Sequence, residues 1–247
     1  MPTMLTLIGI DAAAQRTKTG YAIASWEGSS ALIQRSGVMD HRGAAMAVLV
    51  DALRAGTCLI AIDAPLGWPM GLREALADHL AGQALSRLPD SMFSRASDRR
   101  LRELGHRPLE VGAALIARAA HGALRLLEEL REASGQKLPL LWDPTVTTSG
   151  VIEVYPAATL KTHGHRSTGY KHHEQVNERR EIAAALEPTI IGIAERSERG
   201  ADEFDACLCL LAALDFLDGG CVAPQPAELD VAQREGWIWL RDKAATG

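Results

Sequence analysis

The feature that most constrains the fold of this chain is a short apolar run near its start, LTLIGIDA, which covers Leu5 to Ala12. Half of its residues are Leu or Ile, and small residues follow it directly. An apolar run of this length that stops at a turn is typical of a buried β-strand. Asp11 stands at the far end of the run, and an acid at the end of a buried strand needs a partner.

The next part of the chain predicts two more strands, a helix and a fourth strand. Residues 20–27 and 30–39 are rich in alternating apolar residues and follow turn residues, which indicates an antiparallel meander. Gly43 to Arg54 has apolar residues at helical spacing. Thr57 to Asp63 is almost wholly apolar, as expected for a strand that is covered on both faces. Connections of this kind are short and right-handed, so we expect the fourth strand to lie parallel beside the first.

The remaining elements complete an α/β layer architecture. We expect a mixed five-stranded sheet flanked by helices, in one domain that covers residues 1–247 and carries a helical and loop insertion at about residues 66–108. The fifth strand is Val151 to Tyr155. The expected helices after the fourth strand are Gly71 to Ala81, Leu109 to Ala133, Glu174 to Leu186 and Glu203 to Leu217.

Five acidic residues are placed where their carboxylates could meet and act in catalysis. Asp11 and Asp63 end parallel strands at the sheet edge where open α/β sheets bind ligands. Glu153 lies inside the fifth strand, and Asp202 and Asp205 share one face at the start of an apolar helix. Mg²⁺ or Mn²⁺ would remove the repulsion between these groups. We expect Asp11, Asp63 and Asp205 to be metal ligands, with Asp202 and Glu153 completing or orienting the site.

Simpler interpretations of the same acids stay open. Asp11 and Asp63 are of the residue type that commonly forms turns and caps. Acids in the first turn of a helix are favoured by the helix dipole, which applies to Asp202. Glu153 could lie on an exposed sheet face. Glu203 is expected to point away from the other acids, into solvent.

Composition limits the partners of the protein. The net charge is -5 and the sequence pI is near 5.9, which argues against a protein that coats nucleic acid through a basic surface. The four cysteines form no CxxC motif, and neither a signal peptide nor an apolar segment long enough for a membrane span is found. We expect a cytoplasmic protein with reduced cysteines. The oligomeric state stays open, with a homodimer as one option.

Phosphate contacts would therefore have to be local. The segment from Arg87 to Arg107 contains six arginines and three acids. Arginine binds phosphate oxygens in pairs, although a charged loop is often simply solvated. The expected substrate contacts are Arg95, Arg99, Arg102 and Lys171.

Eight motifs resemble one family along nearly the whole chain. They are GIDAA (9–13), TGYA (19–22), AIDAPLG (61–67), SDRRLR (97–102), IEVYPAATL (152–160), GYK (169–171), DEFDACLCLLAA (202–213) and EGWI (235–238). The chain resembles domain-of-unknown-function family 429, described as predicted ribonuclease-H-like nucleases. The resemblance implies a ribonuclease-H-like fold, related to Holliday-junction resolvases.

In those enzymes an acid on strand one, an acid on strand four and two acids on the last helix hold the metal. By resemblance these are Asp11, Asp63, Asp202 and Asp205. The chain departs from the pattern at Asp63, where resolvase-like enzymes usually have a glutamate, whose side chain is one methylene longer. Glu153 is the residue that would compensate for the shorter side chain.

The sequence thus predicts a metal-dependent phosphodiesterase or nuclease that uses clustered carboxylates and two divalent ions on a nucleic acid or small nucleotide substrate. Two alternatives remain. One is a non-catalytic module of the same fold that binds a nucleotide or a partner protein. The other is an ATP-dependent phosphotransferase, because GIDAAAQRTKTG resembles the first phosphate loop of acetate and sugar kinases, although those enzymes usually duplicate the fold.

Overall fold

A mixed six-stranded sheet forms the centre of the molecule. The computed structural model describes residues 5–85, 87–112, 114–172 and 174–242. The strand order is β5-β4-β1-β2-β3-β6. The strands are β1 (Thr6–Asp11), β2 (Gly20–Trp26), β3 (Ala31–Val38), β4 (Cys58–Asp63), β5 (Gly150–Glu153) and β6 (Ile190–Ile191).

The register of the sheet confirms the predicted neighbours of the first strand. β1 pairs antiparallel with β2 and parallel with β4. The crossover between β1 and β4 contains α1 (Ala44–Ala55), as its helical spacing predicted. Asp11 is the register partner of Asp63, so the two acids end adjacent parallel strands.

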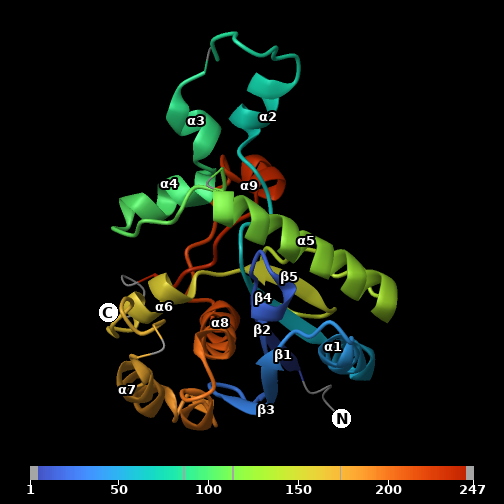
Figure 1. Cartoon of the computed structure of the whole chain (residues 1–247), viewed down its shortest axis with the longest axis vertical. Helices are drawn as coiled ribbons and strands as arrows, with labels where there is room; N and C mark the ends of the chain where they lie inside the picture. The colour runs from blue at the N-terminus through green and yellow to red at the C-terminus, as the bar shows by residue number, and fades with distance from the viewer. Residues whose placement is uncertain (1–4, 86, 113, 173, 243–247) are drawn as a thin grey trace.

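Helices cover both faces of this sheet (Figure 1). The alternation along β1 sends Leu7 to one face and Ile8 and Ile10 to the other. On the face of Leu7 the core is completed by α8 (Ala201–Leu217), with α6 (Pro156–Thr162) and α7 (Val176–Leu186) beside it. On the face of Ile8 it is completed by α1 and by α5 (Ala114–Ser134).

Two glycines bring α8 unusually close to the sheet. A Cβ atom added at Gly9 in β1 would lie 2.0 Å from the carbonyl oxygen of Ala206, and one added at Gly20 in β2 would lie 1.9 Å from that of Asp202. Any larger residue would push the helix away from the strands. The glycines therefore fix where the first turns of α8 lie relative to the end of β1.

The segment between β4 and α5 contains three short helices, and it extends away from the sheet in Figure 1. They are α2 (Met70–Leu76), α3 (Pro89–Phe93) and α4 (Ala96–Glu103). The remaining elements are α9 (Leu229–Glu235) and the 3-10 turns η1 (Arg16–Lys18) and η2 (Ala194–Arg196). In the described parts of the chain, no helix combines the length and apolar character that a membrane crossing requires.

Several predicted bounds need correction. The sheet has six strands instead of the five predicted. The sixth strand, β6, was not predicted because its two residues are too few to give a periodic signal. α2 ends at Leu76, five residues earlier than expected. α5 is described from Ala114, although Leu109 was expected to lie within it.

Candidate functional site

Three carboxylates converge at the carboxyl end of β1 and β4. Asp11 and Asp63 are register partners there, and Asp205 comes from the second turn of α8. Asp205 is only 1% exposed. Its negative charge is close enough to raise the pKa values of both strand acids. The structure thus places Asp11 and Asp63 side by side, and the close approach of α8 to β1 brings Asp205 near these strand ends.

A single lysine lies among these acids. The Nζ atom of Lys171 contacts Oδ2 of Asp205 in an ion pair, while the lysine side chain as a whole is 51% exposed. Burial would lower the pKa of Lys171, but the charges of Asp205, Asp63 and Asp11 raise it above its usual range. One ammonium group therefore faces three carboxylates.

The acids are consequently harder to ionise than ordinary carboxylates. Burial and the neighbouring Asp205 and Asp63 raise the pKa of Asp11 well above its usual value. Burial raises the pKa of Asp63 to about 7, although Lys171 opposes the shift. Burial also raises the pKa of Asp205, again against the effect of Lys171. Negative charge at this position is only partly compensated by the protein.

Two buried polar atoms beside Lys171 form no hydrogen bond of good geometry within the described residues. They are Oδ1 of Asp205 and the hydroxyl oxygen of Tyr170. The Tyr170 hydroxyl nevertheless lies close enough to Asp205 for a hydrogen bond between them to lower the pKa of Asp205. Tyr170 belongs to the GYK motif, but nothing in the sequence predicted a role for its hydroxyl. It is a buried aromatic residue that packs edge-on against Phe204.

The arrangement of side chains is not a ready-made metal centre. Across the described ranges, no group of three or more His, Cys, Asp or Glu side chains lies close enough together to hold a metal ion. The donor type itself, carboxylate oxygen, is the one that hard cations such as Mg²⁺ prefer. The Lys171 ammonium is the cation that the Asp205 carboxylate contacts in this arrangement.

Asp202 and Glu203 lie three and two residues before Asp205 and have different environments. Asp202 is partly buried, and burial raises its pKa while Lys18 and Lys171 oppose the shift. Its charge also contributes to the raised pKa of Asp11. The expectation that Glu203 faces solvent is wrong: it is buried and accepts a 2.6 Å hydrogen bond from Oγ of Ser36.

Glu153 is adjacent to the acids but is paired with Arg95. The guanidinium of Arg95 donates through Nη1 and Nη2 to the two oxygens of Glu153, at 2.9 and 2.7 Å. It donates through Nε and Nη2 to Asp98, and through Nη1 to the carbonyl oxygen of Glu235. An arginine has five N–H donors, and all five are used here. Arg95 is 1% exposed.

This pairing corrects the expectation that Arg95 contacts phosphate, because its guanidinium has no donor left for a ligand. Glu153 also accepts a hydrogen bond from the backbone N–H of Leu66. It lies near enough to raise the pKa of Asp63, yet both its oxygens are occupied. We therefore assign Glu153 a role in positioning the residues at the end of β4, and not a role as a metal ligand.

The other two predicted arginines contact their own segment. Arg99 donates to the carbonyl oxygen of Ser94 at 2.6 Å. Arg102 forms ion pairs with Asp90 and Glu110 and donates to the hydroxyl of Ser94. These contacts link α3, α4 and the start of the next loop. A role for either arginine in substrate binding remains a prediction.

A cavity of about 290 Å³ opens beside Asp63 and Lys171. Most of its wall is apolar, and the ring of Tyr155 lines it together with side chains from the segment before α5. Its lining includes Pro65, Pro108, Leu109, Ile116, Tyr155 and Ile238. Sequence reasoning did not identify this wall, because its residues come from four distant segments.

Comparisons with known proteins identify the family of the chain. Comparison with curated proteins and with solved structures finds no match. One family model, described as a protein of unknown function (DUF429), matches residues 9–229, which contain Asp11, Asp63, Lys171 and Asp205. The chain therefore belongs to the DUF429 family.

Proposed function

We propose that this protein is a metal-dependent phosphodiesterase or nuclease that acts at the meeting point of Asp11, Asp63 and Asp205. The observation that carries the proposal is the placement of buried Asp205 beside the register partners Asp11 and Asp63, three carboxylates that repel one another around one lysine ammonium. A buried acid cluster with raised pKa values is typical of functional sites. The strand order and the position of the acids support the finer assignment to a ribonuclease-H-like fold.

Asp11, Asp63 and Asp205 would hold Mg²⁺ or Mn²⁺ once the Lys171 ammonium moves aside. The bound cation would polarise a phosphoryl oxygen and lower the pKa of a coordinated water. Lys171 is half exposed on a long side chain, so it can leave Asp205 and donate to a phosphate oxygen instead. Asp202 and Glu153 would hold neighbouring groups in place.

The cavity beside Asp63 supports a nucleotide-sized substrate. Its volume of about 290 Å³ and its apolar wall with Tyr155 are suited to a base or sugar placed next to a phosphate at the acids. The acidic net charge of the chain favours a short or structured substrate over a long duplex bound by charge alone.

A second candidate is a non-catalytic module that binds a nucleotide or a partner. The ion pair between Lys171 and Asp205 favours it, because a lysine can permanently neutralise an acid that has lost its metal. The second candidate is also favoured because, among the described residues, no three His, Cys, Asp or Glu side chains lie close enough together to bind a metal ion.

Titration with Mn²⁺ followed by calorimetry distinguishes the two candidates. We expect saturable binding that is lost in Asp205→Asn and retained in Asp51→Asn, an exposed acid on α1. Cleavage of labelled junctions, hybrids and short single strands should then require Mn²⁺ or Mg²⁺ and fail in Asp11→Asn. Absence of Asp205-dependent Mn²⁺ binding would support the non-catalytic module and reject the proposed activity.

A further inference from the structure

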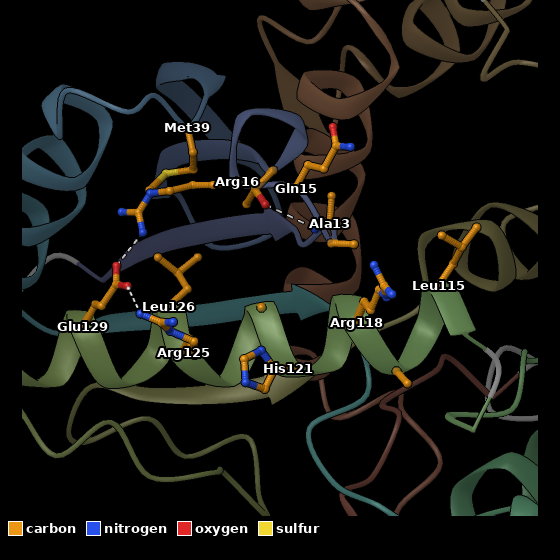
Figure 2. Close-up of a pocket in the computed structure, with 14 residues that line it drawn as sticks. Ala13, Gln15, Arg16, Met39, Leu115, Arg118, His121, Arg125, Leu126 and Glu129 are labelled. Carbon is orange, nitrogen blue, oxygen red and sulfur yellow. Dashed lines mark hydrogen bonds and ion pairs between the residues drawn. The ribbon is translucent and has the colours of Figure 1, made fainter.

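A second, larger cavity adjoins the turn that follows β1. It has a volume of about 740 Å³ and is formed between the turn after β1 and the side of α5 that faces this turn (Figure 2). Residues 13–16 and Thr19 supply one wall, and residues 115–129 of α5 supply most of the other. Met39 and Leu126 also line it. We call this cavity the β1–α5 cleft.

The spacing along α5 explains why one helix face lines the cleft. Arg118, His121, Gly122, Arg125 and Glu129 recur at intervals of three and four residues, which places them on one side of a helix. The helix crosses the turn closely at one point: a Cβ atom added at Gly122 would lie 2.9 Å from the carbonyl oxygen of Ala13. The cleft is therefore a defined part of the packing between α5 and the turn.

The cleft is positively charged in an acidic protein. Three arginines and one glutamate line it, which gives two net positive charges, with His121 in addition. Glu129 pairs with Arg16 at 2.6 Å and with Arg125 at 3.8 Å. Arg118 is exposed and has no charged or hydrogen-bonding partner among the described residues. Figure 2 shows these side chains around the same space.

The position of the cleft connects it to the acids. Ala13 lines it and lies two residues beyond Asp11, which corresponds to about 7 Å of extended chain. Ile116 of α5 lines the cavity beside Asp63, and its neighbours Leu115 and Ala117 line the cleft, so the two cavities adjoin at the start of α5. A substrate longer than one nucleotide could therefore extend from the cavity beside Asp63 into the cleft, past the start of α5.

We infer that the β1–α5 cleft binds the phosphodiester backbone of a single-stranded nucleic-acid segment next to the bond to be cleaved. This inference rests on the proposed function and names its substrate-binding surface. Arginines fit phosphate oxygens because their donors form a planar fork. Exposed Leu115 adds apolar surface for sugars or bases. A few phosphate contacts suit a short strand better than a long duplex.

Anisotropy of a short fluorescent single strand, in DNA and RNA forms, tests the inference without cleavage. Binding is measured in EDTA and again with Ca²⁺. We expect Arg118→Glu to weaken binding about tenfold or more. For Arg118→Ala, the slope of log affinity against log salt should become shallower by about 0.7, as expected for one lost phosphate contact to a single strand. The matched control is Arg180→Glu, an exposed arginine on α7 that pairs with Glu198.

The outcomes separate this inference from the proposed activity. Unchanged binding in both Arg118 variants, with folding verified by thermal melting, overturns the cleft as the binding surface even if Asp11-dependent cleavage is seen. Failure of the wild type to bind either strand overturns it as well. Equal competition by a mononucleotide and by the strand would also contradict it, because a continuous backbone would then add nothing. Strand binding that depends on Arg118 without any cleavage supports the cleft and counts against the nuclease.

Discussion

Two groups of buried charge line the same cavity, and they differ in how completely their polar atoms are paired. Around Arg95, every guanidinium N–H has an acceptor, and Glu153 accepts three hydrogen bonds. Around Lys171, one ammonium contacts one of three carboxylates, and among the described residues the second oxygen of Asp205 forms no hydrogen bond of good geometry, with the Tyr170 hydroxyl as its neighbour. The first group is complete within the chain, and the second is not.

This difference indicates which cluster maintains the fold and which is available to a ligand. Fully paired buried networks fix the relative position of the elements that carry them. The contacts of Arg95 with Asp98 and Glu153 join α4 to β5. The carboxylate of Glu235 in α9 accepts hydrogen bonds from the backbone N–H groups of Met70 and Ala96, at the starts of α2 and α4. Incompletely paired buried groups are rare in folded proteins and call for a partner outside the chain.

The largest expected effect comes from breaking the complete cluster. Arg95→Met leaves Asp98 and Glu153 buried without a positive charge, so we expect a loss of about 3 to 5 kcal/mol in the free energy of unfolding. Urea denaturation followed by circular dichroism measures it.

Arg102→Met on the same helix is the matched control, because Arg102 forms only partly exposed ion pairs, and it should cost less than about 1 kcal/mol. In the double variant Arg95→Met with Glu153→Gln, part of the loss should be recovered, since the two residues act as a pair. A loss for Arg95→Met no larger than that of the control would show that the complete cluster does not maintain the fold.

The incomplete cluster should instead appear in the pH dependence of stability. Asp63 has a pKa of about 7 in the folded chain and about 3.9 when unfolded. Between these values the folded state holds a proton that the unfolded state has released, so this residue makes the protein less stable as pH rises. Relative to wild type, Asp63→Asn should therefore gain about 2 kcal/mol between pH 5 and pH 7, at about 1.4 kcal/mol per pKa unit.

Denaturation across this pH range in EDTA measures the difference, with Asp51→Asn on α1 as the control that should follow the wild-type curve. Parallel curves for wild type and Asp63→Asn would mean that Asp63 ionises as an ordinary exposed acid. The contrast between the two clusters would then lose its electrostatic basis.

The parts of this comparison that the sequence predicted depend on local patterns. β1, α1 and β4 follow from apolar runs and helical spacing, and one rule about crossover connections places Asp63 beside Asp11. Asp205 follows from its spacing to Asp202 at the start of an apolar helix. Each of these inferences uses neighbours in the chain or a single standard connection.

The errors concern pairings between distant segments. Glu153 and Arg95 are 58 residues apart, and no local pattern tells an acid that pairs with arginine from one that binds metal. The contact of Lys171 with Asp205 brings an irregular loop to a helix, so the lysine was predicted to bind substrate without its acidic partner being identified. The β1–α5 cleft was missed for the same reason, because its two walls lie about a hundred residues apart.

The smallest expected effect tests Lys171 directly. If its ammonium and a divalent cation compete for Asp205, then Lys171→Met should bind Mn²⁺ more tightly than wild type. We expect the Kd to fall about tenfold, which corresponds to about 1.4 kcal/mol of removed repulsion. Lys161→Met is the matched control, since the Lys161 ammonium donates to the carbonyl oxygen of Gly105 and should leave Mn²⁺ affinity unchanged. Unchanged or weaker binding in Lys171→Met would show that the lysine is a permanent partner of Asp205, and the second cluster would then be as complete as the first.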